Sequence, residues 1–272
     1  WRSPGEHMVS SMKSVRSISV GIIGSGSIAQ NHADAFARVP GARVTAVASP
    51  TGKNVAAFGK RNGVPRRFTD WRRLCCLDDL DVVTIGSPNH LHAAQAIACL
   101  EAGKHVICEK PLCLTLEEAD AIVAAAKHAR REVFYAEELC FVPKFVKMKE
   151  MVDAGAVGRP YLFKEWEKHA GPYSPWFWRR ETAGGGIMMD MTCHAMEFCR
   201  WLAGKPRVES VFAHCATYLH GAITDLDDNN VVIIEFAGGA VAHVEASWAL
   251  KGGMDSVAEC YGTEGVVYAD MF

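Results

Sequence analysis

Three side chains in this sequence have the types and the spacing for acid–base chemistry. Lys110 directly follows a short apolar segment with strand character, while Asp190 and His194 are four residues apart in a predicted helix over 187–202. That spacing puts both side chains on one helix face. A lysine ammonium can polarise a hydroxyl or carbonyl group, and an imidazole can carry a proton while a carboxylate orients it or binds a substrate hydroxyl. We therefore predict that Lys110, Asp190 and His194 are catalytic.

A glycine-rich turn follows the first apolar run of the chain. Residues 24–29 read Gly-Ser-Gly-Ser-Ile-Ala, the G-x-G-x-x-A pattern, between a predicted strand and a predicted helix. The first glycine permits a tight turn, the second lets the backbone approach a pyrophosphate, and the small third residue lets the helix pack on the sheet. The helix N–H groups then face the phosphates. The expected dinucleotide contacts are Gly24, Gly26, Ser27, Ile28 and Ala29.

The residues after the second predicted strand bear on which dinucleotide binds. An acidic residue at this place would hold the ribose 2′-hydroxyl of NAD. The sequence instead has Ser49-Pro-Thr-Gly-Lys53, with hydrogen-bond donors at Ser49 and Thr51 and a positive charge at Lys53. Such a segment accommodates a 2′-phosphate. We favour NADP over NAD, with Ser49 and Lys53 as contacts, although Lys53 could equally be an exposed residue at a helix start.

Strands and helices alternate through the first half of the chain. The predicted strands cover 17–23, 43–48, 81–85, 105–108 and 132–135, and the predicted helices cover 28–39, 53–62, 91–102 and 116–129. This alternation is typical of an α/β fold with a doubly wound parallel sheet and right-handed crossovers. Since strands of this kind bind ligands at their carboxyl ends, Lys110 and the glycine turn should lie at one edge of the sheet.

The pattern changes in the second half, which predicts a separate domain. Longer strands joined by short glycine turns are expected over 161–169, 208–218, 230–236, 241–250, 256–261 and 266–270, with the helix over 187–202 between the first two. Consecutive strands with short turns predict an α+β domain built on a large, mostly antiparallel sheet. We expect a Rossmann domain over 18–143 and a substrate and dimerisation domain over 144–272. The acidic run 225–228 is expected to be a solvated turn.

Several motifs occur in the same order as in the Gfo/Idh/MocA oxidoreductases. They are Ser87-Pro-Asn-His-Leu-His92, Glu109-Lys110-Pro111, the run from Gly184 through Asp190 to His194, and Tyr261-Gly-Thr-Glu-Gly265. The sequence resembles this family from about Ser17 onward. The resemblance implies an NAD(P)-dependent oxidoreductase that moves a hydride between C4 of nicotinamide and a hydroxyl-bearing carbon of a sugar, inositol, dihydrodiol or related polyol.

The resemblance also implies further contacts at the site. Those expected against the cofactor, mainly nicotinamide and its ribose, are Ser87, Pro88, Asn89, His92, Glu109 and Lys110. The segment 176–180 matches a Trp-Arg motif of the family, so Trp178 and Arg179 are expected near the cofactor or substrate, unless the aromatic residues form an interdomain hinge. Glu138 stands where family members commonly carry an asparagine, so it is a candidate substrate contact and a departure from the family.

Two other functions remain open from the residues. Some members of the family are NAD-dependent glycosidases, which oxidise their substrate only transiently. A cofactor-sensing regulator on the same fold is the other alternative, but it would be expected to lack Lys110 or His194. The resemblance further implies a homodimer or homotetramer through the second sheet. The sequence ends at Phe272, directly after the last predicted strand, whereas family members usually continue towards the first domain.

Composition argues against several other classes of protein. The formal net charge of -2 does not suggest a nucleic-acid surface, and the sequence contains no apolar run of the roughly 20 residues that span a membrane. We expect a cytoplasmic protein with reduced cysteines, because the ten cysteines form no C-x-x-C pair. His90 and His92 have no carboxylate or thiolate at ligand spacing, so no metal site is expected. Residues 1–17 are expected to be a disordered leader.

Overall fold

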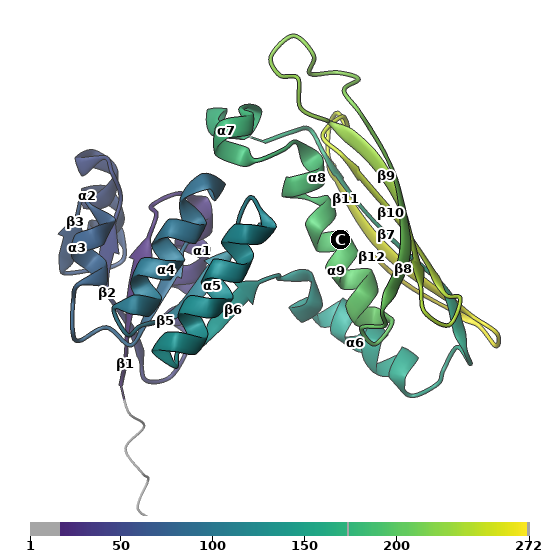
Figure 1. Cartoon of the computed structure of the whole chain (residues 1–272), viewed down its shortest axis with the longest axis horizontal. Helices are drawn as coiled ribbons and strands as arrows, with labels where there is room; N and C mark the ends of the chain where they lie inside the picture. Colours follow the sequence, from purple (N-terminus) through teal and green to yellow (C-terminus); the bar gives the residue numbers. More distant parts are fainter. Residues whose placement is uncertain (1–16, 173, 271–272) are drawn as a thin grey trace, which may run out of the picture.

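The computed structural model describes residues 17–172 and 174–270, which build two sheets with separate hydrophobic cores (Figure 1). The predicted leader lies outside the described residues except for Ser17. Leu139 and helix α6 pack into the core of the second sheet, so we propose that the domain boundary falls just after the first sheet ends, close to the expected position at residue 143.

The first sheet has six parallel strands in the order β3-β2-β1-β4-β5-β6. The strands are β1 Ile18–Ile23, β2 Ala42–Ala48, β3 Arg66–Phe68, β4 Val82–Ile85, β5 His105–Glu109 and β6 Val133–Ala136. The helices between them are α1 Ser27–Phe36, α2 Gly52–Arg61, α3 Trp71–Cys75, α4 His92–Glu101 and α5 Leu116–Ala129, with a 3₁₀ turn η1 at Asn89–Leu91. The predicted α/β Rossmann fold is confirmed.

The sequence analysis missed the third strand and the helix that follows it. β3 has three residues, two of them arginines, so it carries no apolar run to reveal it. It is a strand because it pairs in register with the end of β2, where Ala46 lies opposite Arg66 and Ala48 opposite Phe68. Asp70 then caps α3 by accepting a hydrogen bond from the Arg72 N–H.

The second sheet also has six strands, in the order β12-β11-β7-β10-β9-β8. They are β7 Pro160–His169, β8 Val208–Ala216, β9 Asn229–Phe236, β10 Val241–Ser247, β11 Met254–Gly262 and β12 Val266–Asp270. Neighbouring strands are antiparallel except β7 and β10, which are parallel, so the predicted mostly antiparallel sheet is confirmed. One face packs against α6 Pro143–Asp153 and α9 Thr192–Leu202, as the side view in Figure 1 makes clear.

The predicted single helix over 187–202 is wrong in one respect. The structure breaks it at Met191 into α8 Ile187–Asp190 and α9 Thr192–Leu202. The His194 N–H donates to the Met191 carbonyl instead of reaching back to Asp190, which leaves the Asp190 carbonyl oxygen available to another donor. Two shorter elements precede this break, η3 Pro175–Trp178 and α7 Arg180–Ala183, and η2 Leu139–Phe141 follows β6.

The acidic run 225–228 is not a solvated turn as expected. Asp228 is fully buried and accepts hydrogen bonds from the N–H groups of Tyr218, Leu219 and His220. Those bonds, together with one from the Asn229 side chain, hold the pKa of Asp228 far below its usual value although burial opposes this. The carboxylate therefore ties down the connection between β8 and β9.

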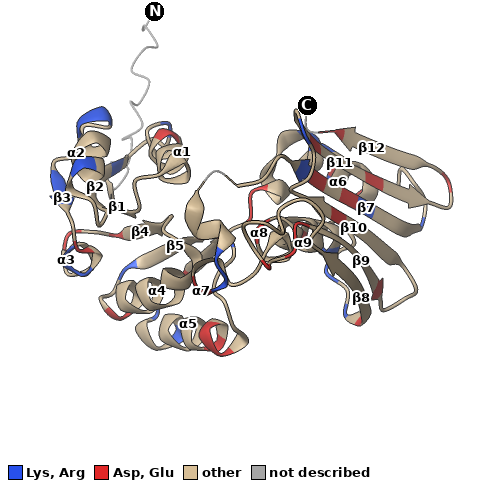
Figure 2. Cartoon of the chain, turned by 90° about the horizontal axis from the view of Figure 1, so that it is seen from above, with Lys and Arg blue, Asp and Glu red and all other residues tan. Residues whose placement is uncertain are grey.

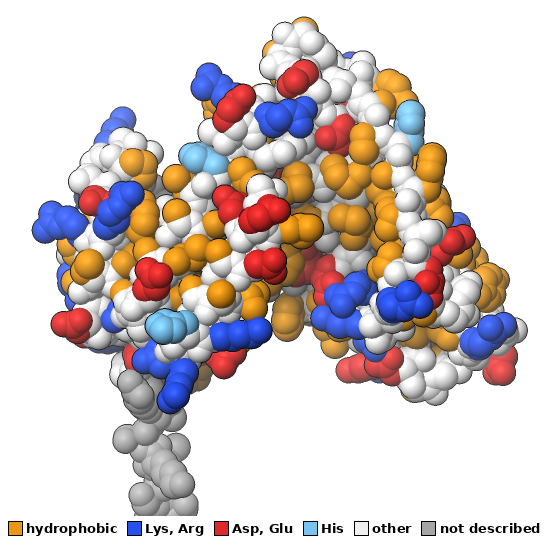
Figure 3. All heavy atoms as spheres, viewed as in Figure 1, with side chains coloured by type: hydrophobic (Ala, Val, Ile, Leu, Met, Phe, Trp, Pro, Cys, Tyr) orange, Lys and Arg blue, Asp and Glu red, His pale blue; other side chains and the backbone are white. Residues whose placement is uncertain are grey.

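Charged side chains are spread over both domains. Figure 2 shows basic residues around α2 and β3 and acidic residues across the strands of the second sheet. On the face seen in Figure 3, groups of both signs are interspersed, with hydrophobic side chains between them. Among the described residues, no helix has the length and apolar character needed to cross a bilayer.

Candidate active site

A cavity of about 810 Å³ lies along the carboxyl ends of the first sheet. The loops after β1, β2, β4 and β5 line it, and Asp190 and the aromatic residues Trp176 and Phe177 close it from the second domain. Strands β1 and β4 are neighbours but are not consecutive in the chain, so the cavity sits where the strand order reverses. Ligands of open α/β sheets bind at this kind of position.

The glycine turn has the geometry of a phosphate cradle. Gly24 has a φ of +121°, and a Cβ built on it would lie 2.4 Å from the Gly86 carbonyl oxygen, so the two loops can approach only because Gly24 has no side chain. A Cβ on Gly26 would meet nothing within 4 Å, so its surroundings are open to a ligand. Gly26 caps α1 without a side-chain hydrogen bond, which leaves N–H groups of the first turn for an anion. The residues present fit a dinucleotide.

These two glycines should respond differently to the same substitution. We expect Gly24→Ala to lower the unfolding free energy by about 1–3 kcal/mol even without cofactor, because of the strained φ and the contact with Gly86. Gly26→Ala should keep the wild-type melting temperature but weaken dinucleotide binding, because the added methyl group would hold the pyrophosphate away from the backbone N–H groups. The expected loss is about tenfold to hundredfold, the value of one contact to a charged group. Thermal melting and cofactor titration separate the two effects. Equal destabilisation by both variants would contradict this assignment.

The remaining residues of the turn lie as the motif implies. Ala29, in the first turn of α1, is fully buried against the sheet, whereas Ser27 is exposed and Ile28 lies at the cavity wall. Ser49 follows β2, and its hydroxyl is 2.7 Å from that of Ser25 across the turn. Ser49 and Thr51 both line the cavity, but Lys53 is exposed and is not among the cavity residues.

Sequence reasoning missed a second contributor to this end of the cavity. Asp70 and Arg72, from the overlooked segment after β3, also line it. The Arg72 guanidinium lies 4.5 Å from the centre of the Trp71 ring. Had the arginine-rich strand been recognised, its carboxyl end would have pointed to the same sheet edge.

The loop after β4 connects the two domains. The Asn89 side chain is buried and donates to the Ala183 carbonyl oxygen of α7, at 2.9 Å. The Ser87 hydroxyl donates to Gln95 at 2.6 Å, and Ser87, Pro88, Asn89 and His92 all line the cavity. The His92 ring lies 2.8 Å from the Ser87 and Pro111 carbonyl oxygens, and burial lowers the pKa of His92. This ring therefore braces the β4 loop against the β5 loop.

The loop after β5 presents the lysine. Glu109 is buried and contacts His32 of α1 at 2.7 Å, which fixes the start of the loop. The Lys110 ammonium donates to the Asp190 carbonyl oxygen at 2.8 Å and to the Asp190 Oδ1 at 3.0 Å. Its third donor has no partner among the described residues. Burial alone would lower the pKa of Lys110, but the Asp190 carboxylate, with Cys193, raises it above the ordinary value, so the group is a cation.

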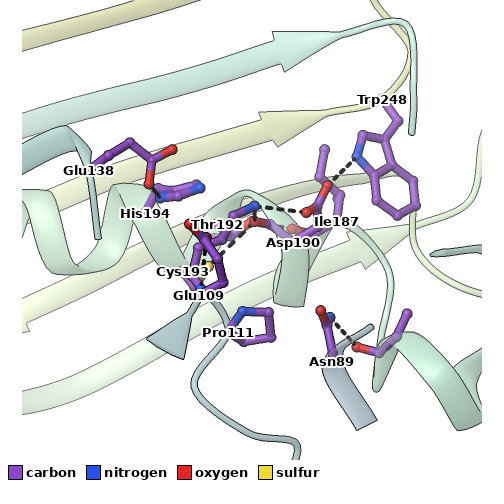
Figure 4. A network of polar contacts seen from close by, with 12 residues as sticks. Asn89, Glu109, Pro111, Glu138, Ile187, Asp190, Thr192, Cys193, His194 and Trp248 are labelled. Carbon is purple, nitrogen blue, oxygen red and sulfur yellow. Dashed lines mark hydrogen bonds and ion pairs between the residues drawn. The ribbon is translucent and has the colours of Figure 1, made fainter. Parts of the chain in front are cut away.

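Trp248 and the aromatic ring packed against it hold Asp190 in place. Its Oδ2 accepts a hydrogen bond from the Trp248 indole at 3.3 Å, as Figure 4 shows. Trp248 packs edge-on against Trp178, which also contacts the His220 ring. Trp178 thus supports Asp190 from behind, whereas Trp176 and Phe177 face the cavity. Arg179 is exposed and is not among the cavity residues.

His194 takes its orientation from Glu137, not from Asp190 as the helix spacing suggested. Its Nδ1 lies 2.8 Å from both oxygens of Glu137, and 3.6 Å from a Glu138 oxygen. Because a carboxylate only accepts, Nδ1 must donate, and the lone pair of Nε2 is left free to take a proton. Burial and Lys110 act to lower the pKa of His194, but Glu137 and Glu138 outweigh them and raise it.

The three residues predicted to be catalytic, Lys110, Asp190 and His194, thus lie together at one end of the cavity. Figure 4 shows Asp190 and His194 of the second domain facing Glu109 and Pro111 of the β5 loop, with Glu138 beside His194. Glu138 lines the cavity, whereas His194 is 2% exposed and lies just behind its wall. Glu137 was not predicted, although a carboxylate one residue past β6 lies at the same sheet edge as Lys110.

Comparison with known proteins agrees with this arrangement. Residues 18–137 match the model of the oxidoreductase family with an NAD-binding Rossmann fold, and residues 145–268 match the Gfo/Idh/MocA C-terminal domain. The chain is 32% identical to levoglucosan dehydrogenase of Pseudarthrobacter phenanthrenivorans, over 93% of this chain and 73% of that protein. It is 30% identical to myo-inositol 2-dehydrogenase of Thermotoga maritima, over 92% of this chain and 75% of that protein.

Solved structures give the same result. GenD2 from gentamicin A biosynthesis, in complex with NAD, is similar with a TM-score of 0.90 and 31% identity, covering 99% of this chain and 75% of that one. Levoglucosan dehydrogenase in complex with NADH and levoglucosan has a TM-score of 0.86 at 32% identity, covering 94% of this chain and 74% of that one. Both domains, the nucleotide cradle and the order of the site residues therefore lead to one conclusion: this chain belongs to the Gfo/Idh/MocA family of NAD-binding oxidoreductases.

Proposed function

We propose that this protein is a dehydrogenase or reductase of a sugar, inositol or related polyol. The observation that carries the proposal is the cationic Lys110 at the carboxyl end of β5, held by Asp190 beside a histidine whose Nε2 is free. Relatives named for levoglucosan and inositol oxidation share the fold over most of this chain. Nicotinamide would supply the hydride acceptor in oxidation, or the donor in reduction.

Side chains of this protein bind the reacting oxygen and transfer its proton. Lys110 uses its third donor to bind the reacting hydroxyl oxygen and stabilises the negative charge that develops there. His194 accepts the hydroxyl proton at Nε2 as the C–H bond gives up its hydride, and Glu137 stabilises the resulting imidazolium. The products are the carbonyl compound, reduced nicotinamide and a protonated His194. We also propose that Ser87, Pro88, Asn89 and His92 hold the nicotinamide end, with Gly24, Gly26, Ser27, Ile28 and Ala29 at the pyrophosphate.

A substrate screen tests this function directly. Sugars, inositols and other polyols are incubated with each oxidised cofactor, and the corresponding ketoses and inososes with each reduced cofactor, while nicotinamide absorbance is followed. Net production or consumption of reduced cofactor in proportion to product supports a dehydrogenase. Turnover of a glycoside without net reduced cofactor would identify a glycosidase instead, and the absence of any turnover would refute the proposal.

We propose that the cofactor is NADP in preference to NAD, on the chemistry of the loop after β2. No carboxylate follows β2 directly, and Ser49 and Thr51 provide hydroxyl donors at the cavity wall. Lys53 is exposed in the segment that follows β2, and Arg72 places a second positive charge at the same end of the cavity. Asp70 also lines the cavity here and would favour NAD.

Ser49→Asp should shift this preference towards NAD. The new carboxylate would repel a 2′-phosphate and accept a hydrogen bond from a free ribose hydroxyl. Loss of one charge-assisted contact is worth about 1.5–3 kcal/mol, or tenfold to hundredfold in NADP affinity. Dissociation constants for both cofactors are measured on the wild type and the variant, with Lys53→Ala as a second probe. Tighter NAD binding by the wild type would show that NADP is not the cofactor.

We further propose that the outer face of the second sheet forms a dimer. Phe212 of β8 and Tyr268 of β12 lie on this face at opposite edges of the sheet and are strongly exposed, and Val231 lies between them. Exposed apolar residues on one sheet face commonly mark an interface. Light scattering at micromolar concentration should give a dimer or tetramer. Phe212→Glu should weaken it, while Phe134→Glu, a control on the first domain, should not; a wild-type monomer would refute the proposal.

A further inference from the structure

The residues at and just behind the substrate end of the cavity include more carboxyl groups than cations. Asp190 pairs with Lys110, and Glu137 pairs with His194. Glu138 shares the same histidine at a longer distance, 3.6 Å, and keeps a mostly exposed side chain at the cavity wall. Glu167 of β7 forms no ion pair with any described residue. Two carboxyl groups therefore lack a full ion-pair partner next to the reacting groups.

Glu167 is the stronger of the two observations, because it is buried and unsatisfied. The residue is 5% exposed, and its Oε2 is inaccessible and has no hydrogen bond among the described residues. Glu167 pairs with Ala246 of β10, which belongs to the same buried cluster as Met191 and Trp248 beside Asp190. Its carboxyl group also interacts electrostatically with His194 and Lys110, so it lies next to the predicted catalytic residues. Burial raises the pKa of Glu167 to about 7, and Glu138 and Asp190 raise it further against His194 and Lys110. An unpaired acid in this position is unfavourable unless a ligand satisfies it.

The chemistry of that ligand follows from the charge. A neutral hydroxyl could donate one hydrogen bond to Glu167 but would leave the ionised form of this carboxyl group without a cation in a poorly hydrated place. An ammonium group can both donate a hydrogen bond to Glu167 and compensate its negative charge. A metal ion on Glu137, Glu138 and His194 is less suitable, because both Glu137 oxygens already bind His194, and one of them also accepts from the Leu139 N–H.

Building on the proposed function, we infer that Glu167 and Glu138 form a subsite for a protonated amino group of the substrate. The substrate class is then an amino sugar or aminocyclitol, with the amine at Glu167 and the reacting hydroxyl at Lys110. The subsite recognises the substrate and takes no part in hydride or proton transfer.

Matched ligand pairs test this inference on protein loaded with NADPH or NADH, whichever of the two binds more tightly. Calorimetry compares glucosamine with glucose, and scyllo-inosamine with scyllo-inositol, and oxidation of each compound is measured with NAD and NADP. At least one amine should bind about tenfold to hundredfold more tightly than its hydroxyl counterpart, as one charge-assisted contact predicts. Glu167→Gln should abolish this difference, mainly through KM, and Glu138→Gln should reduce it.

Glu165→Gln is the matched control, since Glu165 lies two residues away on the same strand face, is fully buried and also lacks side-chain hydrogen bonds among the described residues. Its carboxyl group interacts electrostatically with Glu137 and Glu167 but, unlike that of Glu167, not with Lys110 or His194. This variant should leave the amine preference unchanged. Equal or weaker binding of both amines, or a preference that survives Glu167→Gln, would overturn the inference. Stabilisation by Zn²⁺ or Mn²⁺ without any amine preference would also overturn the inference and would indicate a metal site instead. Oxidation of neutral polyols alone would refute the amine subsite while leaving the proposed function intact, and no oxidation of any compound would refute both.

Discussion

Lys110→Ala is expected to lower kcat by about 10²–10⁴-fold, the usual cost of losing a group that assists proton transfer. The variant lacks the cation that binds the reacting oxygen, and Asp190 cannot replace it because a carboxylate would repel the developing charge. Steady-state kinetics on the best substrate of the screen measures the loss. Dinucleotide affinity should change little, because the pyrophosphate contacts lie on the glycine turn.

Two accompanying variants separate chemistry from folding. Lys110→Ala leaves the buried Asp190 carboxylate with only the Trp248 hydrogen bond, so its melting temperature should be compared with that of Lys110→Arg, which keeps the charge. Asp190→Asn should also depress turnover, since it removes the carboxylate that raises the pKa of Lys110. If folded Lys110→Ala protein turned over at a near wild-type rate, Lys110 would not be catalytic.

His194→Ala is expected to produce the second large loss, again about 10²–10⁴-fold in kcat, because it removes the imidazole that Glu137 orients and whose Nε2 is proposed to accept the hydroxyl proton. Cofactor affinity should be preserved, since His194 lies in the second domain behind the cavity wall. A dissociation constant raised as strongly as by Gly26→Ala would show that His194 contacts the dinucleotide instead.

Glu137→Gln distinguishes a proton-accepting histidine from a merely structural one. Oxidation requires neutral His194, so its rate should fall as the pH drops through the pKa of this residue, which Glu137 and Glu138 raise. Replacing Glu137 removes part of that increase, so the acidic limb of the pH–rate profile should move to lower pH. The plateau should also drop, because the ring loses its orienting acceptor. An unchanged limb together with lower activity would indicate a packing role alone.

The sequence by itself determined those structural elements of this protein that depend on residues close together in the chain. The tight turn at Gly24, the helix that follows the glycine turn and the alternation of β-branched strands with helices all depend on nearby residues, so pattern and spacing predicted them. Lys110 was placed at the sheet edge for the same reason, because a residue that follows a parallel strand must lie at its carboxyl end.

Tertiary structure alone decided which groups pair with which. Because the helix breaks at Met191, the Asp190 carbonyl oxygen can accept a hydrogen bond from Lys110, which lies 80 positions away in the chain. His194 binds Glu137, which lies 57 positions away. The three-residue strand β3 exists only through its pairing with β2, and Asp228 is buried because backbone N–H groups of a folded loop surround it. The spacing of apolar residues along a segment predicts whether that segment forms a helix or a strand. Partners between distant side chains depend on how the two domains pack, which no single segment encodes.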